Sequence, residues 1–272
     1  MGTVAGRKEG TLWLGTQSWS HESWRGVFYS EAAEASAFIR EYAEQFPVVE
    51  IDSTWYRIPT PYQIAHWHDQ TPERFLFTAK VPRIITHEKV LSDCQDELTA
   101  FLRVMDGLGE KLGPLLFQFP YFNKNAFSSP DPFFDRLAGF LASLPEGYRF
   151  AVEIRNKHWL LPRLIDLLRE SGVAYCLIDH VWMPRIEQLT EKLDVVTSDF
   201  CYVRWLGDRS GIEKKTKTWG TLIEDKTKEM KGCIEPLQNI LRMGIPIFGF
   251  FNNHYAGHAP ASVRAFQALW EE

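Results

Sequence analysis

Eight short apolar segments, distributed along the whole chain, constrain the fold of this sequence more than any other feature. Each is four or five residues long, and roughly 25–45 residues separate the start of one from the start of the next. This spacing leaves room for a loop, a helix and a second loop, as consecutive parallel strands require. The segments are residues 12–15, 48–51, 75–79, 115–119, 150–154, 174–178, 202–206 and 247–251.

Amphipathic helical patterns lie between these predicted strands. Apolar residues recur at helical spacing over 36–45, 98–108, 133–144, 160–171, 234–242 and 261–270. Glycine, which often ends a helix, precedes several strands, at Gly113, Gly147, Gly172 and Gly244. The 272 residues therefore predict one (β/α)8 TIM barrel over 1–272, a fold that needs roughly 250 residues.

An open doubly wound sheet is the alternative to a closed barrel. Such sheets often bind dinucleotides through a glycine-rich turn after a strand, and no such turn is present, so the sequence predicts no nucleotide cofactor. Residues 1–10 are polar and glycine-rich and are expected to be flexible. The longest irregular stretch, 207–220, is expected to be a loop that serves as a mobile lid.

Composition narrows the function classes. The net charge is -5, which argues against a general nucleic-acid coat but leaves room for a local basic groove. No apolar stretch approaches the roughly 20 residues of a membrane span, and the N-terminus lacks a signal-peptide pattern. A cytoplasmic protein without membrane contact is expected, with its four dispersed cysteines as free thiols.

The candidate site lies where the strands end, because TIM barrels carry function at that end. In the second strand Glu50, Asp52 and Thr54 follow a period of two, so they are expected to share the inward face. The other strands end with further polar side chains. These are Lys80, Gln118, Glu153, Arg155, Asp179, Arg204, Asn252 and Asn253.

Seven of these groups are charged, four negative and three positive. Their convergence predicts a pocket for a polar ligand, since buried ion pairs rarely offset their desolvation. An internal salt-bridge network is the alternative. His87 and His180 follow strands and add proton carriers, and Tyr56 and Trp159 add aromatic surface. A divalent metal held by Asp52, Glu153 or Asp179 is a further alternative, but no ligand motif at fixed spacing supports it, and no metal ligand is assigned.

The strand ends also resemble those of a known family. Residues 49–57, Val-Glu-Ile-Asp-Ser-Thr-Trp-Tyr-Arg, are similar to a motif of the YecE-like family, a domain of unknown function. Similar stretches follow in order at 75–87, 112–120, 152–159, 202–207 and 251–260. The chain departs from the family pattern at Asp52, where Asn is usual. The resemblance implies a (β/α)8 barrel without an established activity, and the shape is similar to endonuclease IV and xylose isomerase-like barrels.

Three hypotheses follow. The leading one is an enzyme of hydrolase, isomerase or lyase type that uses acid/base chemistry on a small polar, phosphorylated or sugar-like substrate, with Glu50, Lys80 and Glu153 as catalytic residues. The substrate-binding residues are then Asp52, Thr54, Tyr56, His87, Gln118, Arg155, Trp159, Asp179, Arg204, Asn252 and Asn253. The second is a nucleic-acid-binding or phosphodiester-cleaving protein. The third is a protein that binds a ligand without converting it.

Overall fold

The computed structural model describes residues 10–272 and contains a closed barrel of eight parallel strands. The strands neighbour one another in chain order, and β1 also pairs with β8, with Leu12 opposite Ile247, so the sheet has no free edge. The predicted (β/α)8 fold is confirmed. The expected flexible segment 1–10 lies, except for Gly10, outside the described residues. The strands are β1 Leu12–Gln17, β2 Val48–Ile51, β3 Leu76–Lys80, β4 Leu112–Gln118, β5 Phe150–Glu153, β6 Ala174–His180, β7 Cys201–Gly207 and β8 Ile247–Phe251.

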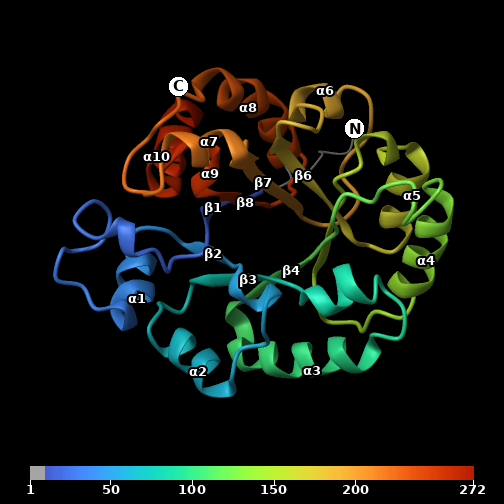
Figure 1. Ribbon diagram of the computed structural model, residues 1–272, viewed down its shortest axis with the longest axis horizontal. Helices are drawn as coiled ribbons and strands as arrows, with labels where there is room; N and C mark the ends of the chain where they lie inside the picture. The colour runs from blue at the N-terminus through green and yellow to red at the C-terminus, as the bar shows by residue number, and fades with distance from the viewer. Residues whose placement is uncertain (1–9) are drawn as a thin grey trace, which may run out of the picture.

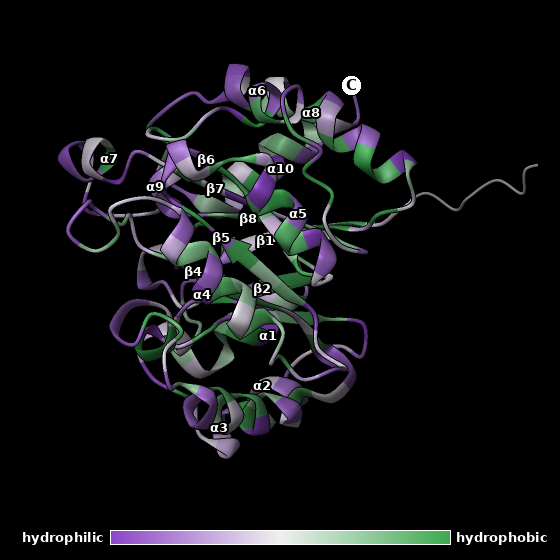
Figure 2. Cartoon of the chain, turned by 90° about the vertical axis from the view of Figure 1, so that its right-hand side faces the viewer, coloured by the Kyte–Doolittle hydropathy of each residue, from purple (hydrophilic) through white to green (hydrophobic). Residues whose placement is uncertain are grey.

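Helices surround this barrel (Figure 1). They are α1 Phe38–Ala43, α2 Pro61–Asp69, α3 Gln95–Met105, α4 Asp131–Leu141, α5 Pro162–Glu170, α6 Ile186–Thr190, α7 Arg209–Lys215, α8 Thr227–Arg242, α9 Asn253–Ala256 and α10 Ala259–Trp270. Figure 2 shows hydrophobic strands in the interior and hydrophilic colour on the outer helices and loops. Within the described chain, no helix is both long and apolar enough to cross a membrane.

Local sequence explains several helix boundaries. Pro61 and Pro162 begin α2 and α5, where proline loses no helical hydrogen bond. Thr60 caps α2: its hydroxyl accepts the backbone N–H of Gln63, whose side chain accepts the N–H of Thr60. The helix expected over 234–242 begins earlier, at Thr227, and contains Pro236.

The stretch 207–220 differs from the prediction because it contains α7. Its first residue, Gly207, has a φ of 68°, and a β-carbon there would lie 2.6 Å from Cα of Tyr255. Glycine is therefore required for the close packing of this turn on α9. The segment is partly helical rather than an irregular loop.

The inside of the barrel has an apolar lower part and a polar upper part. Inward-facing residues of the lower layers, such as Val48, Leu116 and Phe248, form one buried cluster, and a separate cluster fills the space between sheet and helices. Toward the carboxyl ends of the strands the inward positions become Glu50, Glu153 and their neighbours. The apolar layers therefore form the base beneath the charged groups. The four cysteines are buried and form no disulfide.

A charged hollow at the carboxyl ends of the strands

Arg204 on β7 lies at the centre of the polar layer and binds two carboxylates at once. Its Nη2 donates to Oε1 of Glu50 at 2.8 Å, and its Nη1 donates to Oε2 of Glu153. The three side chains are at most 2% exposed. Because β2, β5 and β7 each contribute one member, this Glu50–Arg204–Glu153 triad spans the barrel.

Neutral side chains hold the triad in place. The hydroxyl of Tyr202 donates to the second oxygen of Glu50 at 2.7 Å and also contacts the hydroxyl of Thr78 at 2.9 Å. Oε1 of Gln17 accepts from Nη2 of Arg204 at 3.0 Å and from Nδ2 of Asn252 at 2.8 Å. Among the described residues, Nε of Arg204 has no hydrogen-bond partner. Most polar atoms of this layer are therefore satisfied by groups fixed on strands.

The two carboxyl groups of the triad differ in their proton affinity. Burial would raise the pKa of Glu153, but the guanidiniums of Arg204 and Arg155 outweigh it and hold that pKa at about 2. Burial also raises the pKa of Glu50, and here the opposing effect of Arg204 is too weak to cancel it, in part because Asp52 lies nearby. The two carboxyls that share Arg204 therefore have pKa values shifted in opposite directions, upward for Glu50 and downward for Glu153.

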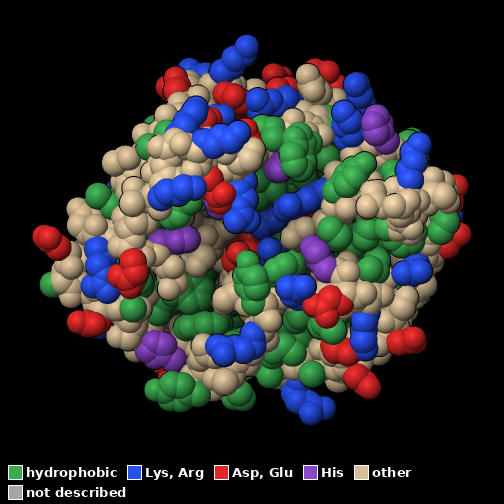
Figure 3. All heavy atoms as spheres, viewed as in Figure 1, with side chains coloured by type: hydrophobic (Ala, Val, Ile, Leu, Met, Phe, Trp, Pro, Cys, Tyr) green, Lys and Arg blue, Asp and Glu red, His purple; other side chains and the backbone are tan. Residues whose placement is uncertain are grey.

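Above the triad, partly exposed charged side chains line a hollow. Nζ of Lys80 lies 2.8 Å from Oδ1 of Asp52 and 5.2 Å from the ring centre of Trp55. Nε of Arg155 donates to Oε1 of Glu153 at 2.8 Å, and one third of the Arg155 side chain is exposed. In Figure 3, which faces the end of the barrel that carries α7 and α9, Lys and Arg side chains gather in a hollow near the middle.

Ionisable groups around the hollow respond to this charge. Burial raises the pKa of Asp52, but the ammonium of Lys80 outweighs it, and the net shift is downward. Burial, reinforced by the charges of Lys80 and Arg155, lowers the pKa of His87 to about 4. Burial and Arg155 also lower the pKa of His180. Both imidazoles are therefore neutral near pH 7 and can accept a hydrogen bond.

The structure brings about half of the predicted site residues together. Those that contact one another or line the hollow are Glu50, Asp52, Lys80, His87, Glu153, Arg155, Arg204 and Asn252. Asp52 does not lie on the strand, contrary to the prediction, because β2 ends at Ile51. Asp52 stands at the N-cap position of the short helix Ser53–Trp55 without a side-chain capping bond, and its carboxylate pairs with Lys80 instead. The alternation of faces expected for 50–54 therefore stops at the strand end.

Two polar residues predicted to bind substrate have other partners. The hydroxyl of Thr54 donates to the backbone oxygens of Ile51 and Lys80, which ties β2 to β3. Asp179 faces outward, because its neighbour Ile178 belongs to the inner cluster. Its carboxylate accepts from Arg185 at 2.6 Å and from Tyr255 at 3.2 Å. These contacts place both residues in the scaffold rather than in the hollow.

The remaining predicted residues divide among packing, capping and exposure. Asn253 is buried and its side chain accepts the backbone N–H of Ala259 at the start of α10. Trp159 packs in an aromatic cluster with Phe122 and Phe133. Gln118 is buried and donates to the oxygen of Phe119. Tyr56 is largely exposed and its ring contacts Trp55.

Gln17 and Tyr202 were missed by the sequence prediction. The first predicted strand stops at residue 15, although continued alternation makes Gln17 its next inward position. Tyr202 alternates with Arg204 on β7, so the same period of two could have identified it. In both cases the signal was present in the sequence.

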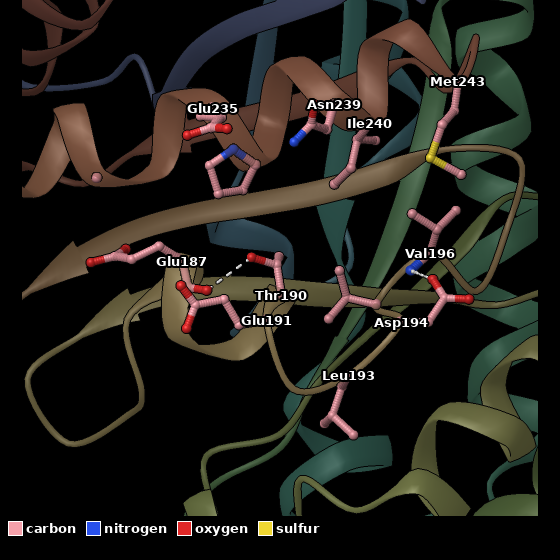
Figure 4. A pocket seen from close by; sticks show the side chains of 13 residues that line it. Glu187, Thr190, Glu191, Leu193, Asp194, Val196, Glu235, Asn239, Ile240 and Met243 are labelled. Carbon is pink, nitrogen blue, oxygen red and sulfur yellow. Dashed lines mark hydrogen bonds between the residues drawn. The ribbon is translucent and has the colours of Figure 1, made fainter.

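Two further observations bear on the wider molecule. In the part of the chain that the structure describes, no group of three or more His, Cys, Asp or Glu side chains is arranged to hold a metal ion. A cavity of about 380 Å³ lies on the outside of the barrel between α6 and α8, bordered by Glu187, Glu191, Asp194 and Glu235 (Figure 4). No predicted site residue lines it.

The fold and the site define a (β/α)8-barrel protein with an ion-paired, charged hollow at the carboxyl ends of its strands. The family model for DUF72, described as a protein of unknown function, matches residues 13–272, so the chain belongs to the DUF72 family. The resemblance to the YecE-like family is thereby confirmed.

Individual relatives agree. The chain is 32% identical to the UPF0759 protein YecE of Escherichia coli strain K12 over 189 residues, covering 66% of this chain and 65% of that protein, so the match spans just under two thirds of the relative. It is 24% identical to YunF of Bacillus subtilis over 278 residues, with 91% and 90% covered.

Solved structures give the same fold. A DUF72 family protein from Thermotoga maritima is 26% identical, with a TM-score of 0.73 and coverage of 96% of this chain and 100% of that one. A glycoside hydrolase family 5 enzyme from Prevotella bryantii, with a TM-score of 0.52 and 9% identity over 98% and 97% of the two chains, shares the fold alone.

Proposed function

We propose that the hollow binds a small anionic substrate and converts it by general acid/base chemistry. The observation that supports this proposal is an imbalance of free hydrogen-bonding groups. Both oxygens of Glu50 and both of Glu153 already accept hydrogen bonds from the protein. In contrast, among residues 10–272 the two terminal nitrogens of Arg155 have no protein partner, and Nζ of Lys80 pairs with one oxygen of Asp52 and lies over the ring of Trp55.

Free donors and occupied acceptors favour an anion over a cation. A guanidinium with two free NH2 groups matches the oxygens of a phosphate or carboxylate in a fork-like geometry. The hollow therefore combines donors fixed at strand ends with two cationic side chains, Lys80 and Arg155.

Within this proposal Lys80 is the group that exchanges a proton with the substrate. Its ammonium is nearly buried, is held in place by the carboxylate of Asp52, and can donate a proton to a substrate atom that develops negative charge. Glu50 and Glu153 are fully buried, so we assign them as positioning residues that act through Arg204 and Arg155. Asn252, half-buried and fixed by Gln17, orients the bound group.

Calorimetric titration with inorganic phosphate tests the binding step. Arg155→Met should weaken phosphate binding about 10-fold or more, because a charge-assisted hydrogen bond contributes about 1.5–3 kcal/mol. Arg163→Met on the outer surface of α5 removes an equal charge and should leave the affinity unchanged. Equal affinities for the wild type and Arg155→Met would refute the proposal.

A screen of phosphorylated and carboxylated metabolites then tests turnover. Lys80→Met should abolish conversion of any substrate found while the fold persists. A ligand that binds and is recovered unchanged would favour the non-catalytic hypothesis, and salt-dependent binding of oligonucleotides would favour the nucleic-acid one.

A further inference from the structure

A second cavity opens beside Asp52, and its lining differs in kind from that of the cationic hollow. It has a volume of about 350 Å³ and lies among the loop after β1, the start of α1 and the helix α2. Its polar lining residues other than Asp52 are Ser18, Ser20, Ser36, Ser53, Gln63 and His66. Apart from the carboxylate of Asp52, the cavity therefore presents hydroxyl, amide and imidazole groups.

Several of these groups are solvent-exposed and free to bind a ligand. Within residues 10–272, the hydroxyls of Ser20, Ser36 and Ser53 make no hydrogen bond to the protein, whereas Oγ of Ser18 accepts the backbone N–H of Ser20 at 3.2 Å. A serine hydroxyl can donate one hydrogen bond and accept two. The cavity therefore offers both donors and acceptors, which is the pattern that recognises an alcohol.

The backbone at the cavity is strained. Ser18 has a φ of 69°, a left-handed conformation that is unfavourable for a residue with a β-carbon. Its N–H donates to the oxygen of Glu50 at 2.8 Å, and its own oxygen accepts from the hydroxyl of Thr16. These bonds fix the turn after β1, so that Ser18 and Ser20 both line the cavity. Strain of this kind concentrates at binding sites.

Two tryptophans complete the lining. Trp19 and Trp67 are almost fully buried and meet edge to face, with ring centres 5.1 Å apart. A ligand with C–H groups on one side and hydroxyls on the other can contact an aromatic wall and the serines together. A polyol or sugar has that character.

Asp52 joins the two spaces. It lines the serine cavity, and its Oδ1 contacts Nζ of Lys80 in the cationic hollow. We propose that the serine cavity binds the hydroxyl-bearing part of the substrate while its anionic group occupies the hollow, so that the substrate is a phosphorylated or otherwise anionic polyol. This inference rests on the proposed function for the anionic group but not for the hydroxyl-bearing group.

Calorimetric titration with matched probes tests the inference. Sorbitol 6-phosphate and hexyl phosphate have the same carbon chain and phosphate and differ in their hydroxyls. The wild type should bind sorbitol 6-phosphate at least about 10-fold more tightly, since each hydroxyl contact contributes roughly 5-fold. Equal or tighter binding of hexyl phosphate would overturn the inference.

Variants locate the effect. The double substitution Ser36→Leu/Ser53→Leu should reduce the preference below about 3-fold while leaving the affinity for inorganic phosphate unchanged. Ser36→Ala/Ser53→Ala should reduce it in the same direction and guards against steric damage. Ser143→Leu, at an exposed position after α4 at the other end of the barrel, should retain the preference. A preference that survives both double variants would place the hydroxyl contacts elsewhere and refute the cavity.

The probes separate this inference from the proposed function. If inorganic phosphate does not bind but unphosphorylated sorbitol binds and is lost in the serine variants, the hollow assignment fails and the cavity assignment stands. If inorganic phosphate binds through Arg155 but sorbitol 6-phosphate binds no more tightly than hexyl phosphate, the cavity assignment fails and the hollow assignment stands.

Discussion

Arg204→Met should destabilise the protein far more than removal of any surface arginine. The change leaves the carboxyls of Glu50 and Glu153 buried without their shared cation and removes donors to both and to Gln17. Breaking a buried ion pair by removing one partner costs about 3–5 kcal/mol. We therefore expect the free energy of unfolding at pH 7, measured by urea denaturation, to fall by about that amount.

The pH dependence gives this prediction a sharper form. Without Arg204 the remaining carboxyls are expected to have raised pKa values, so they take up protons as the pH falls. A protonated carboxyl no longer carries an uncompensated charge, and the deficit of Arg204→Met relative to wild type should shrink from pH 7 to pH 5. The triple variant Glu50→Gln/Glu153→Gln/Arg204→Met should recover much of the stability, because all three charges are absent.

Arg163→Met is the matched control. Arg163 lies on the surface and pairs with Asp131 and Asp135, so its removal should change the unfolding free energy by less than about 1 kcal/mol. A loss below about 1 kcal/mol for Arg204→Met, or a loss of the same size at pH 5 and pH 7, would refute the role of the triad described here.

Three further predictions concern Glu153, Thr54 and Gly207. The pKa of Glu153 is held at about 2 instead of the ordinary 4.5, so ionised Glu153 contributes about 3 kcal/mol to stability above pH 4.5, and this contribution is lost as the pH falls toward 2. Glu153→Gln should flatten the dependence of the urea-unfolding free energy on pH over this range, and an unchanged pH dependence would contradict the assignment. Thr54→Val removes the hydrogen bond to the backbone oxygen of Lys80 and should lower the unfolding free energy by about 1–2 kcal/mol without altering phosphate affinity. Weakened phosphate binding would instead show that Thr54 contributes to the binding site. Gly207→Ala should destabilise by about 1–3 kcal/mol because a β-carbon there meets the backbone of Tyr255, and near-wild-type thermal stability would show that the α9 turn can adjust.

The barrel could be predicted from sequence because its signal is repeated. Each strand is a separate apolar run, and errors at individual boundaries leave the count of units unchanged. The boundaries shifted where the local pattern is ambiguous: β4 begins at Leu112 instead of 115, because Gly113 and Pro114 resemble a turn in isolation. The helix α7 was missed because its sequence, with Gly211 and several charges, lacks a clear apolar stripe.

The site was predicted less completely, because the sequence does not give the direction in which each side chain points. Sequence indicates which residues lie near a strand end, but the direction of a side chain depends on where the strand stops. Asp179 lies near a strand end but points outward, because β6 continues to His180 and keeps its alternation. Thr54 fails for the opposite reason, because β2 stops before it. The serine cavity is lined by the loop after β1, the start of α1 and the helix α2, and no single local sequence pattern predicts that these elements enclose it.

The central claim is that the hollow above the Glu50–Arg204–Glu153 triad is an anion site. A crystal structure of the wild type soaked with tungstate, a phosphate mimic with a strong anomalous signal, tests it most directly. The claim predicts an anomalous peak within hydrogen-bond distance of the terminal nitrogens of Arg155 and of Nζ of Lys80, and loss of that peak in Arg155→Met. An empty hollow in crystals that bind tungstate elsewhere would contradict it.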